Sequence, residues 1–345
     1  MLETTVPDAV PEPASDGDDA RTHHPLRWAA AAAIGSVVVL AALTPSYSLA
    51  STILIYAIAV LGTNLLLGYT GLLSFGQGIF FGMGAYAAGL SFLHLGVQTP
   101  AGLVIASMVG MLTATVVGSL CILRRGVTFV MLTFAFAAMF GYLVYVLSDI
   151  TGGENGLRGF DARGVGALGV EVTVLSSNLA VFVLVALCFI AVYLFLTRVI
   201  HSPFGATLMA IRENEDRAAA IGYNTMLFKL LAFSLSGLVT GLAGGLYAIY
   251  LGAVPDTALQ PEISTTILVM TILGGAGSLY GSFLGAVIFL TLSDYLSQVW
   301  DRWQILLAIA LIAIVLYLRG GVWGAIELGV KQVRRRAGRA SKASR

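Results

Sequence analysis

Residues 49–86 read LASTILIYAIAVLGTNLLLGYTGLLSFGQGIFFGMGAY, and this stretch decides the class of fold. Its first half, 49–67, is an apolar run without Asp, Glu, Lys or Arg. A helix of about 20 such residues crosses ~30 Å of hydrocarbon. Its second half contains six glycines. Because irregular backbone at membrane depth must be covered by protein or line a water-filled cavity, the stretch predicts a helical membrane protein with a shielded, glycine-rich segment.

The composition of the whole chain agrees with this prediction. The 345 residues are 58% hydrophobic and 11% charged, with a mean hydropathy of +0.90. A soluble domain carries about 25% charged residues. Too few charges are present to cover a water-facing surface, so lipid must be the solvent for most of the chain. The net charge of +1 points to no nucleic-acid partner.

Apolar runs recur along the sequence and predict an all-α integral membrane protein, a polytopic bundle of about ten transmembrane helices. Several runs are shorter than a full span, so we expect some helices to be broken or shielded by protein. The runs lie at about 28–43, 49–67, 78–95, 101–123, 126–149, 176–198, 227–251, 263–277, 281–298 and 303–319.

The distribution of basic residues predicts the orientation. With ten spans and a cytoplasmic carboxyl tail, only Arg158, Arg163 and Arg302 of the 19 basic residues face outward, as the positive-inside rule requires. Both termini are then cytoplasmic. We expect a disordered cytoplasmic tail at 1–26, a transmembrane domain at 27–320 with a cytoplasmic loop at 202–226, and a basic cytoplasmic tail at 321–345.

The cytoplasmic loop is too amphipathic to be a simple connector. Residues 206–221 predict one short helix, and Gly222 follows as its C-cap. Such a helix suits a groove on another protein, although an ordinary interfacial helix remains an alternative. The expected apolar face comprises Leu208, Ile211, Ala218 and Ile221, and the expected charged face comprises Arg212, Glu213, Glu215, Asp216 and Arg217.

Two glycine-rich segments are candidates for lining a pathway or for tight helix packing. Glycine at this density lets backbones approach closely, and the two interpretations remain open. The segment at 68–86 offers Gly71, Ser74, Gln77 and Gly78. The segment at 274–285, GGAGSLYGSFLG, offers Gly274, Gly275 and Ser278.

Ionisable residues are almost lacking in the middle of the runs, which argues against coupling to an ion gradient through buried carboxylates. The sequence also lacks the phosphate-binding pattern GxxxxGK[ST]. Cys121 and Cys188 lie in apolar runs and are expected to pack there. The histidines suggest no metal site and no catalytic group is expected. Energy must therefore come from a partner, or movement must be passive.

The chain resembles the LivM-type permease subunits of ABC importers for branched-chain amino acids, over roughly residues 50–325. The resemblance rests on four segments in the same order: 68–86, TGGENGL at 151–157, the loop with Asp216-Arg217-Ala218 and Gly222, and 272–285. In the third segment Asp replaces Glu and Arg replaces the first Ala of the family's Glu-Ala-Ala…Gly motif.

The resemblance implies a transport subunit of a bacterial inner membrane that is not itself an enzyme and binds no cofactor. Its partners would be a second homologous permease, two cytoplasmic ATP-binding subunits that use ATP and Mg²⁺, and an extracytoplasmic solute-binding protein. The loop would couple to the ATPase through Arg212, Glu213, Asp216, Arg217, Ala218 and Gly222.

Three alternatives remain at this point. Permeases for urea, short amides or other small organic solutes are similar in sequence to this group, and the spans hold no distinctive counter-ion for an amino acid. A passive channel is possible. A membrane-embedded enzyme would need clustered Asp, His or Arg at a membrane boundary, and no such cluster is found.

Overall fold

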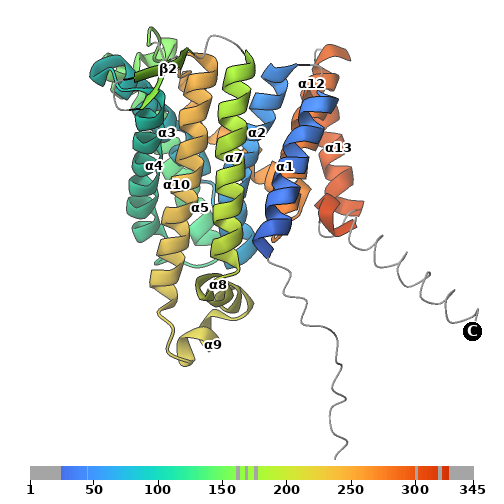
Figure 1. Cartoon of the computed structure of the whole chain (residues 1–345). Coiled ribbons are helices and arrows are strands. Elements are labelled where there is room, and N and C mark those ends of the chain that lie inside the picture. The colour runs from blue at the N-terminus through green and yellow to red at the C-terminus, as the bar shows by residue number, and fades with distance from the viewer. Residues whose placement is uncertain are drawn as a thin grey trace, which may run out of the picture.

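The computed structural model describes residues 25–44, 46–160, 164–167, 170–174, 178–299, 302–317 and 321–325. The described chain is a bundle of long helices, mostly lying side by side (Figure 1). Each of the ten apolar runs lies on a helix, which confirms the predicted polytopic helical fold. These helices are α1 (Pro25–Leu43), α2 (Tyr47–Asn64) with the π-helical turn η1 (Leu65–Thr70), α3 (Gln77–Leu95), α4 (Thr99–Cys121), α5 (Val127–Val146), α7 (Asn178–Ile200), α10 (Thr225–Leu251), α11 (Pro261–Gly274), α12 (Leu279–Val299) and α13 (Trp303–Tyr317).

The lengths of these helices divide them into two groups. In the described part of the chain, seven helices are long and apolar enough to cross a membrane: α2 with η1, α3, α4, α5, α7, α10 and α12. Helix α11 and the apolar part of α1, Ala29–Ala42, are shorter, and α13 has 15 residues. The predicted short helices are therefore present, and α11 among them has half of its residues buried. Of the two predicted tails, 1–24 and 326–345 lie outside the described residues.

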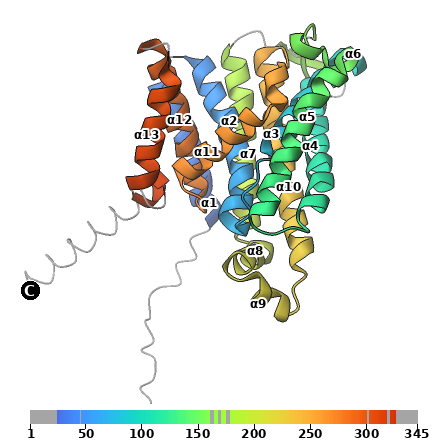
Figure 2. The same ribbon diagram turned by 180° about the vertical axis from the view of Figure 1, so that it is seen from behind.

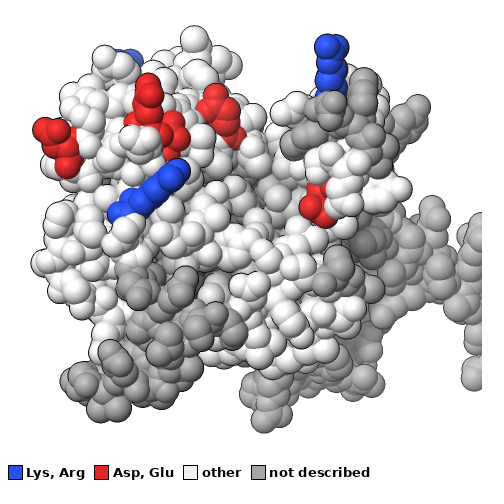
Figure 3. All heavy atoms as spheres, turned by 90° about the horizontal axis from the view of Figure 1, so that it is seen from above, with Lys and Arg blue, Asp and Glu red and all other residues white. Residues whose placement is uncertain are grey.

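The short helices α8 (Pro203–Glu213) and α9 (Glu215–Ala220) project together from one end of the bundle. The start of α1 and the end of α13 lie at this same end (Figures 1 and 2). The two ends of the bundle sequence lie on the same side when an even number of helices crosses between them. The distribution of basic residues predicts such an even number. The opposite end carries α6 (Ser148–Thr151), and Figure 3, which views that end, shows several acidic side chains on it.

Helix α10 packs against α2, α3 and α4. Glycines bring the backbones together there. A Cβ at Gly84 of α3 would lie 2.2 Å from the backbone oxygen of Gly241, and one at Gly110 of α4 would lie 2.5 Å from that of Gly237. Small residues at helix crossings are the usual means of tight packing in lipid. Helix α2 with η1 is the most enclosed of the seven spans. Of the residues in its most apolar stretch, 89% are buried inside the protein.

A small antiparallel hairpin lies in the connection between α5 and α7, an addition to the expected all-helical fold. It pairs β1 (Gly164–Ala167) with β2 (Val170–Val174). The same connection holds the short helix η2 (Gly153–Asn155) and is tied to the α10–α11 connection, which includes η3 (Asp256–Leu259). Leu157 N donates to Val254 O at 2.9 Å, and Val254 N donates to Leu157 O at 2.8 Å. The glycine-rich loop at 151–157 is thus part of the folded end of the bundle.

Candidate functional site

The projecting loop contains two helices, whereas the sequence predicted one helix over 206–221. The break lies at Asn214, whose backbone is extended, with φ −159° and ψ 102°. Its side-chain oxygen accepts a hydrogen bond from the backbone N–H of Arg217 at 2.9 Å. Asparagine is a favoured N-cap because its side chain satisfies a free N–H of the first turn. It therefore starts α9 at the position where α8 ends.

The apolar face of the loop is shorter than expected. Leu208 and Ile211 of α8 and Ala218 of α9 are buried, as predicted, but Ile221 is 72% exposed. The break at Asn214 changes the direction of the chain, so the helical spacing that placed Ile221 on this face does not apply. Gly222 has φ +101°. The N–H of Tyr223 donates to Ala218 O at 3.2 Å, which completes a glycine C-cap as predicted.

Arg212 connects the loop to both glycine-rich segments. Its Nη1 donates a hydrogen bond to the backbone oxygen of Gly68 in η1. Its side chain also crosses Gly71, where an added Cβ would lie 3.2 Å from Arg212 Cγ. A Cβ at Gly277, in the α11–α12 connection, would lie 3.4 Å from Arg212 Nη1. Three segments that are far apart in the sequence therefore meet at one guanidinium group.

Glu215 anchors α9 to the bundle, and the sequence alone did not identify this role. Its Oε2 lies 2.5 Å from Nζ of Lys229, and its Oε1 lies 3.3 Å from Nη2 of Arg125. Lys229 is only 6% exposed, so its ammonium group needs the carboxylate. The available signal was Lys229 itself, a basic residue in the apolar run that forms α10.

The other charged residues of the loop take no part in the Glu215–Lys229 ion pair. Asp216 Oδ1 accepts a hydrogen bond from Arg125 Nη1 at 3.1 Å, and its side chain is 84% exposed. The hydrogen bond to Asp216 and the two neighbouring carboxylates raise the pKa of Arg125 above its usual value. Glu213 and Arg217 are exposed. The surface that points away from the bundle is thus of mixed charge.

The polar residues of the first glycine-rich segment make contacts between helices. Gln77, fully buried at the start of α3, donates from Nε2 to Ser236 Oγ at 3.1 Å and accepts at Oε1 from Thr240 Oγ1 at 2.9 Å. Both partners lie on α10. Ser74 is buried, and its Oγ accepts from the N–H of Gly76 at 3.1 Å. The contacts of Gln77 are those of helix packing, whereas the contact of Ser74 lies within its own turn.

Gly71 and Gly78 of the same segment have separate structural reasons to be glycine. Gly71 ends η1 in the left-handed region, with φ +74°. The N–H of Gly78 donates to Ser264 Oγ of α11 at 2.8 Å, and a Cβ at Gly78 would lie 2.6 Å from that oxygen. Gly78 thus sets the close approach of α3 and α11.

The late glycine-rich segment is held in place by Asn64, a residue that the sequence analysis did not select. Asn64 is fully buried at the end of α2. Its Oδ1 accepts from the N–H of Gly277 at 2.8 Å, and its Nδ2 donates to Ser278 O and to Ser282 Oγ, each at 2.7 Å. An amide in an otherwise apolar run needs such partners, and this was the available signal.

Gly274 and Gly275 form the tight turn from α11 into α12. A Cβ at Gly274 would lie 1.9 Å from the oxygen of Gly281, and Gly275 has φ +109°. The hydroxyl of Ser278 accepts from the N–H of Gly281 at 3.2 Å and so caps the start of α12. Among the described residues no group of three or more His, Cys, Asp or Glu could hold a metal ion.

Comparison with known proteins gives one family. The family model described as "Branched-chain amino acid transport system / permease component" matches residues 46–316. The chain is 29% identical over 251 residues to the high-affinity branched-chain amino acid transport system permease protein LivM of Salmonella typhimurium, covering 67% of this chain and 58% of that protein. It is 28% identical over 245 residues to LivM of Escherichia coli, covering 66% and 58%.

A shorter match is to a probable branched-chain amino acid transport permease protein LivM of Methanocaldococcus jannaschii. That match is 31% identical over 85 residues, covering 24% of this chain and 25% of the relative. The first two matches span 58% of the length of each relative. No solved structure matches the chain.

Proposed function

The chain belongs to the family of permease components of branched-chain amino acid transport systems, and on this premise we propose that it is a transmembrane subunit of an ABC importer. Its cargo is a branched-chain amino acid or a similar small, amino-acid-like solute. The polytopic helical fold is that of a multi-pass membrane protein. The proposed location is the bacterial cytoplasmic membrane, with α8 and α9 on the cytoplasmic side.

The proposed assembly contains a second homologous permease, two cytoplasmic ATP-binding subunits and an extracytoplasmic solute-binding protein. The family is one of transport components, and in this proposal ATP and Mg²⁺ are bound by the partners. The observation that carries the proposal is the connection at Arg212. A pair of helices that projects from the bundle is attached to the two glycine-rich segments inside it.

The residues of α8 and α9 divide into two proposed roles. Glu213, Asp216 and Arg217 are exposed and would contact the ATP-binding subunit, with apolar Ile221 and Tyr223 beside them. Arg212, the buried Ala218 and the C-cap at Gly222 would keep the helices rigid and attached. A short amphipathic element with apolar anchors and a charged rim is well suited to a groove on a partner protein.

Reconstitution of the assembly in proteoliposomes tests the proposal. With both permeases, the ATP-binding subunits and the binding protein present, we expect uptake of leucine that requires ATP, and no uptake of urea. Omission of the ATP-binding subunits should abolish uptake. Transport of leucine by this chain alone, without a nucleotide-cleaving subunit, would contradict the proposal and favour a passive channel.

A further inference from the structure

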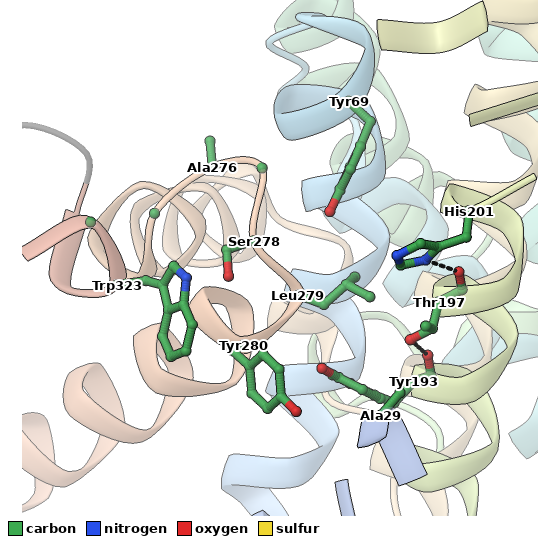
Figure 4. Close-up of a pocket in the computed structure, with 13 residues that line it drawn as sticks. Ala29, Tyr69, Tyr193, Thr197, His201, Ala276, Ser278, Leu279, Tyr280 and Trp323 are labelled. Carbon is green, nitrogen blue, oxygen red and sulfur yellow. Dashed lines mark hydrogen bonds between the residues drawn. The ribbon is translucent and has the colours of Figure 1, made fainter. Parts of the chain in front are cut away.

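A cavity of about 570 Å³ lies near the end of the bundle that carries α8. Small-molecule pockets have volumes of roughly 300–1,000 Å³. The cavity is lined by parts of the chain that are far apart in sequence, namely α1, η1, the end of α7, the turn before α12 with its first residues, and the helical residues 321–325. In Figure 4 the side chains of Tyr69, His201, Ser278 and Tyr280 surround the same space.

One wall of the cavity is aromatic. The rings of Tyr193 and Tyr280 have centroids 5.6 Å apart, and the ring of Tyr280 stacks on that of Trp323 at 5.2 Å. Tyr193 is 3% exposed. Among the described residues that line the cavity there is no Asp, Glu, Lys or Arg. Such a wall can cover an aliphatic side chain, and aromatic faces also attract an ammonium group.

The turn that leads into α12 adds polar backbone groups beside the aromatic wall. Ser278 lines the cavity together with Leu279 and Tyr280 of the first helical turn. The N–H of Gly281 donates to Ser278 Oγ, whereas the N–H groups of Leu279 and Tyr280 have no acceptor among the described residues. Free N–H groups at the start of a helix favour a carboxylate.

The projecting helices are attached to this cavity. Gly277 lines it, and Gly68, which accepts the hydrogen bond from Arg212, directly precedes Tyr69 of the cavity wall. Asn64 fixes Gly277 and Ser278 to α2. A displacement of α8 would therefore be transmitted through Arg212 to two walls of the cavity.

We propose that this cavity is a binding site for the transported solute on the α8 side of the bundle, and that it takes an aliphatic α-amino acid. The aromatic wall covers the side chain, and the first turn of α12 receives the carboxylate. The inference rests on the proposed function and gives its cargo a location.

Protection of introduced cysteines tests the site. In the full assembly, Cys121 and Cys188 are first replaced by Ala, and Ser278→Cys and His201→Cys then place a thiol on two different walls. Ala210→Cys, on an exposed position of α8, is the matched control. The rate of maleimide labelling is measured in inside-out vesicles without ATP, with leucine, with urea, or with isoamylamine, which is leucine's side chain and amine without the carboxylate.

We expect leucine to slow labelling at positions 278 and 201 at least threefold and to leave position 210 unchanged. Urea should give no protection, and isoamylamine should protect less than leucine. ATP-driven uptake of leucine by the same variants is measured in proteoliposomes and reports on the proposed function separately. Unchanged labelling at positions 278 and 201, in variants that still take up leucine in proteoliposomes, would overturn the site and leave the proposed function intact. Equal slowing at position 210 would also overturn it, because the effect would then be a general closure.

Discussion

Arg212 of α8 donates a hydrogen bond from Nη1 to the backbone oxygen of Gly68, which lies 144 residues earlier in the π-helical turn after α2. A charged donor on a backbone acceptor is stronger than a neutral pair. Since η1 is part of a buried span, this contact joins the most enclosed of the seven spans to the helices that project from the end of the bundle.

The first prediction concerns this contact. Arg212→Glu removes the donor and places a carboxylate beside a carbonyl oxygen, so we expect ATP-driven uptake to fall at least tenfold while the assembly remains intact. Uptake and ATPase activity are measured together in proteoliposomes. Arg124→Ala is the control, because Arg124 is exposed in the α4–α5 connection. Normal coupling in the Arg212 variant would exclude a role of this bond in transmission.

The second prediction concerns Glu215 and Lys229. Glu215→Ala removes the carboxylate that lies 2.5 Å from Nζ of Lys229, a residue that is only 6% exposed. The unpaired ammonium group should lower the free energy of unfolding by on the order of 3 kcal/mol. Asp216→Ala removes an exposed ion pair to Arg125, which water and salt screen, and should cost far less than Glu215→Ala. Thermal unfolding in detergent measures both. The double variant Glu215→Gln with Lys229→Met should recover part of the loss. Equal losses for the two single variants would show that Glu215 is not an anchor.

The third prediction concerns the crossing of α3 and α10. Gly84→Ala would place a Cβ 2.2 Å from the oxygen of Gly241, so the helices must separate, at a cost of about 1–3 kcal/mol. In contrast, a Cβ at Gly35 of α1 meets nothing within 4 Å, and Gly35→Ala should not lower stability. The melting temperatures of the two variants in detergent provide the comparison. A tolerated Gly84→Ala would mean that the crossing is loose.

The fourth prediction separates packing from transport at Gln77. Gln77→Ala leaves Ser236 and Thr240 of α10 without this partner in a buried place, at a cost of about 1–3 kcal/mol. We expect a lower melting temperature and less folded protein in the membrane. The KM for leucine, measured per folded assembly, should remain within about twofold. A large change in KM with normal stability would place Gln77 on the solute pathway.

The sequence predicted the elements of this fold better than their contacts. The ten apolar runs appear as helices because the length and composition of a segment are enough to identify a membrane helix, without knowledge of its neighbours. The break at Asn214 was missed because one polar residue within a helical pattern is compatible with either continuation or capping. Ile221 was misplaced as a consequence.

The contacts of Asn64 and Glu215 could not be obtained in the same way. The spans are apolar on nearly all sides, so periodicity does not indicate which neighbour a helix has. Asn64 meets Gly277 across more than 200 residues, and Glu215 meets Lys229 through the turn into α10. Buried polar atoms do indicate that some partner exists. They do not indicate which one.

The π-helical turn at Leu65–Thr70 has an implication for how relatives of this chain can diverge. A π turn contains one residue more than an α turn, and an α-helix rotates by about 100° per residue. Deletion of a single residue here would restore regular α-helical winding. The Gly68 carbonyl would then turn away from Arg212, whose hydrogen bond it accepts. The attachment point of the projecting helices is therefore encoded in the number of residues, so substitutions in this turn should be inherited far more readily than insertions or deletions.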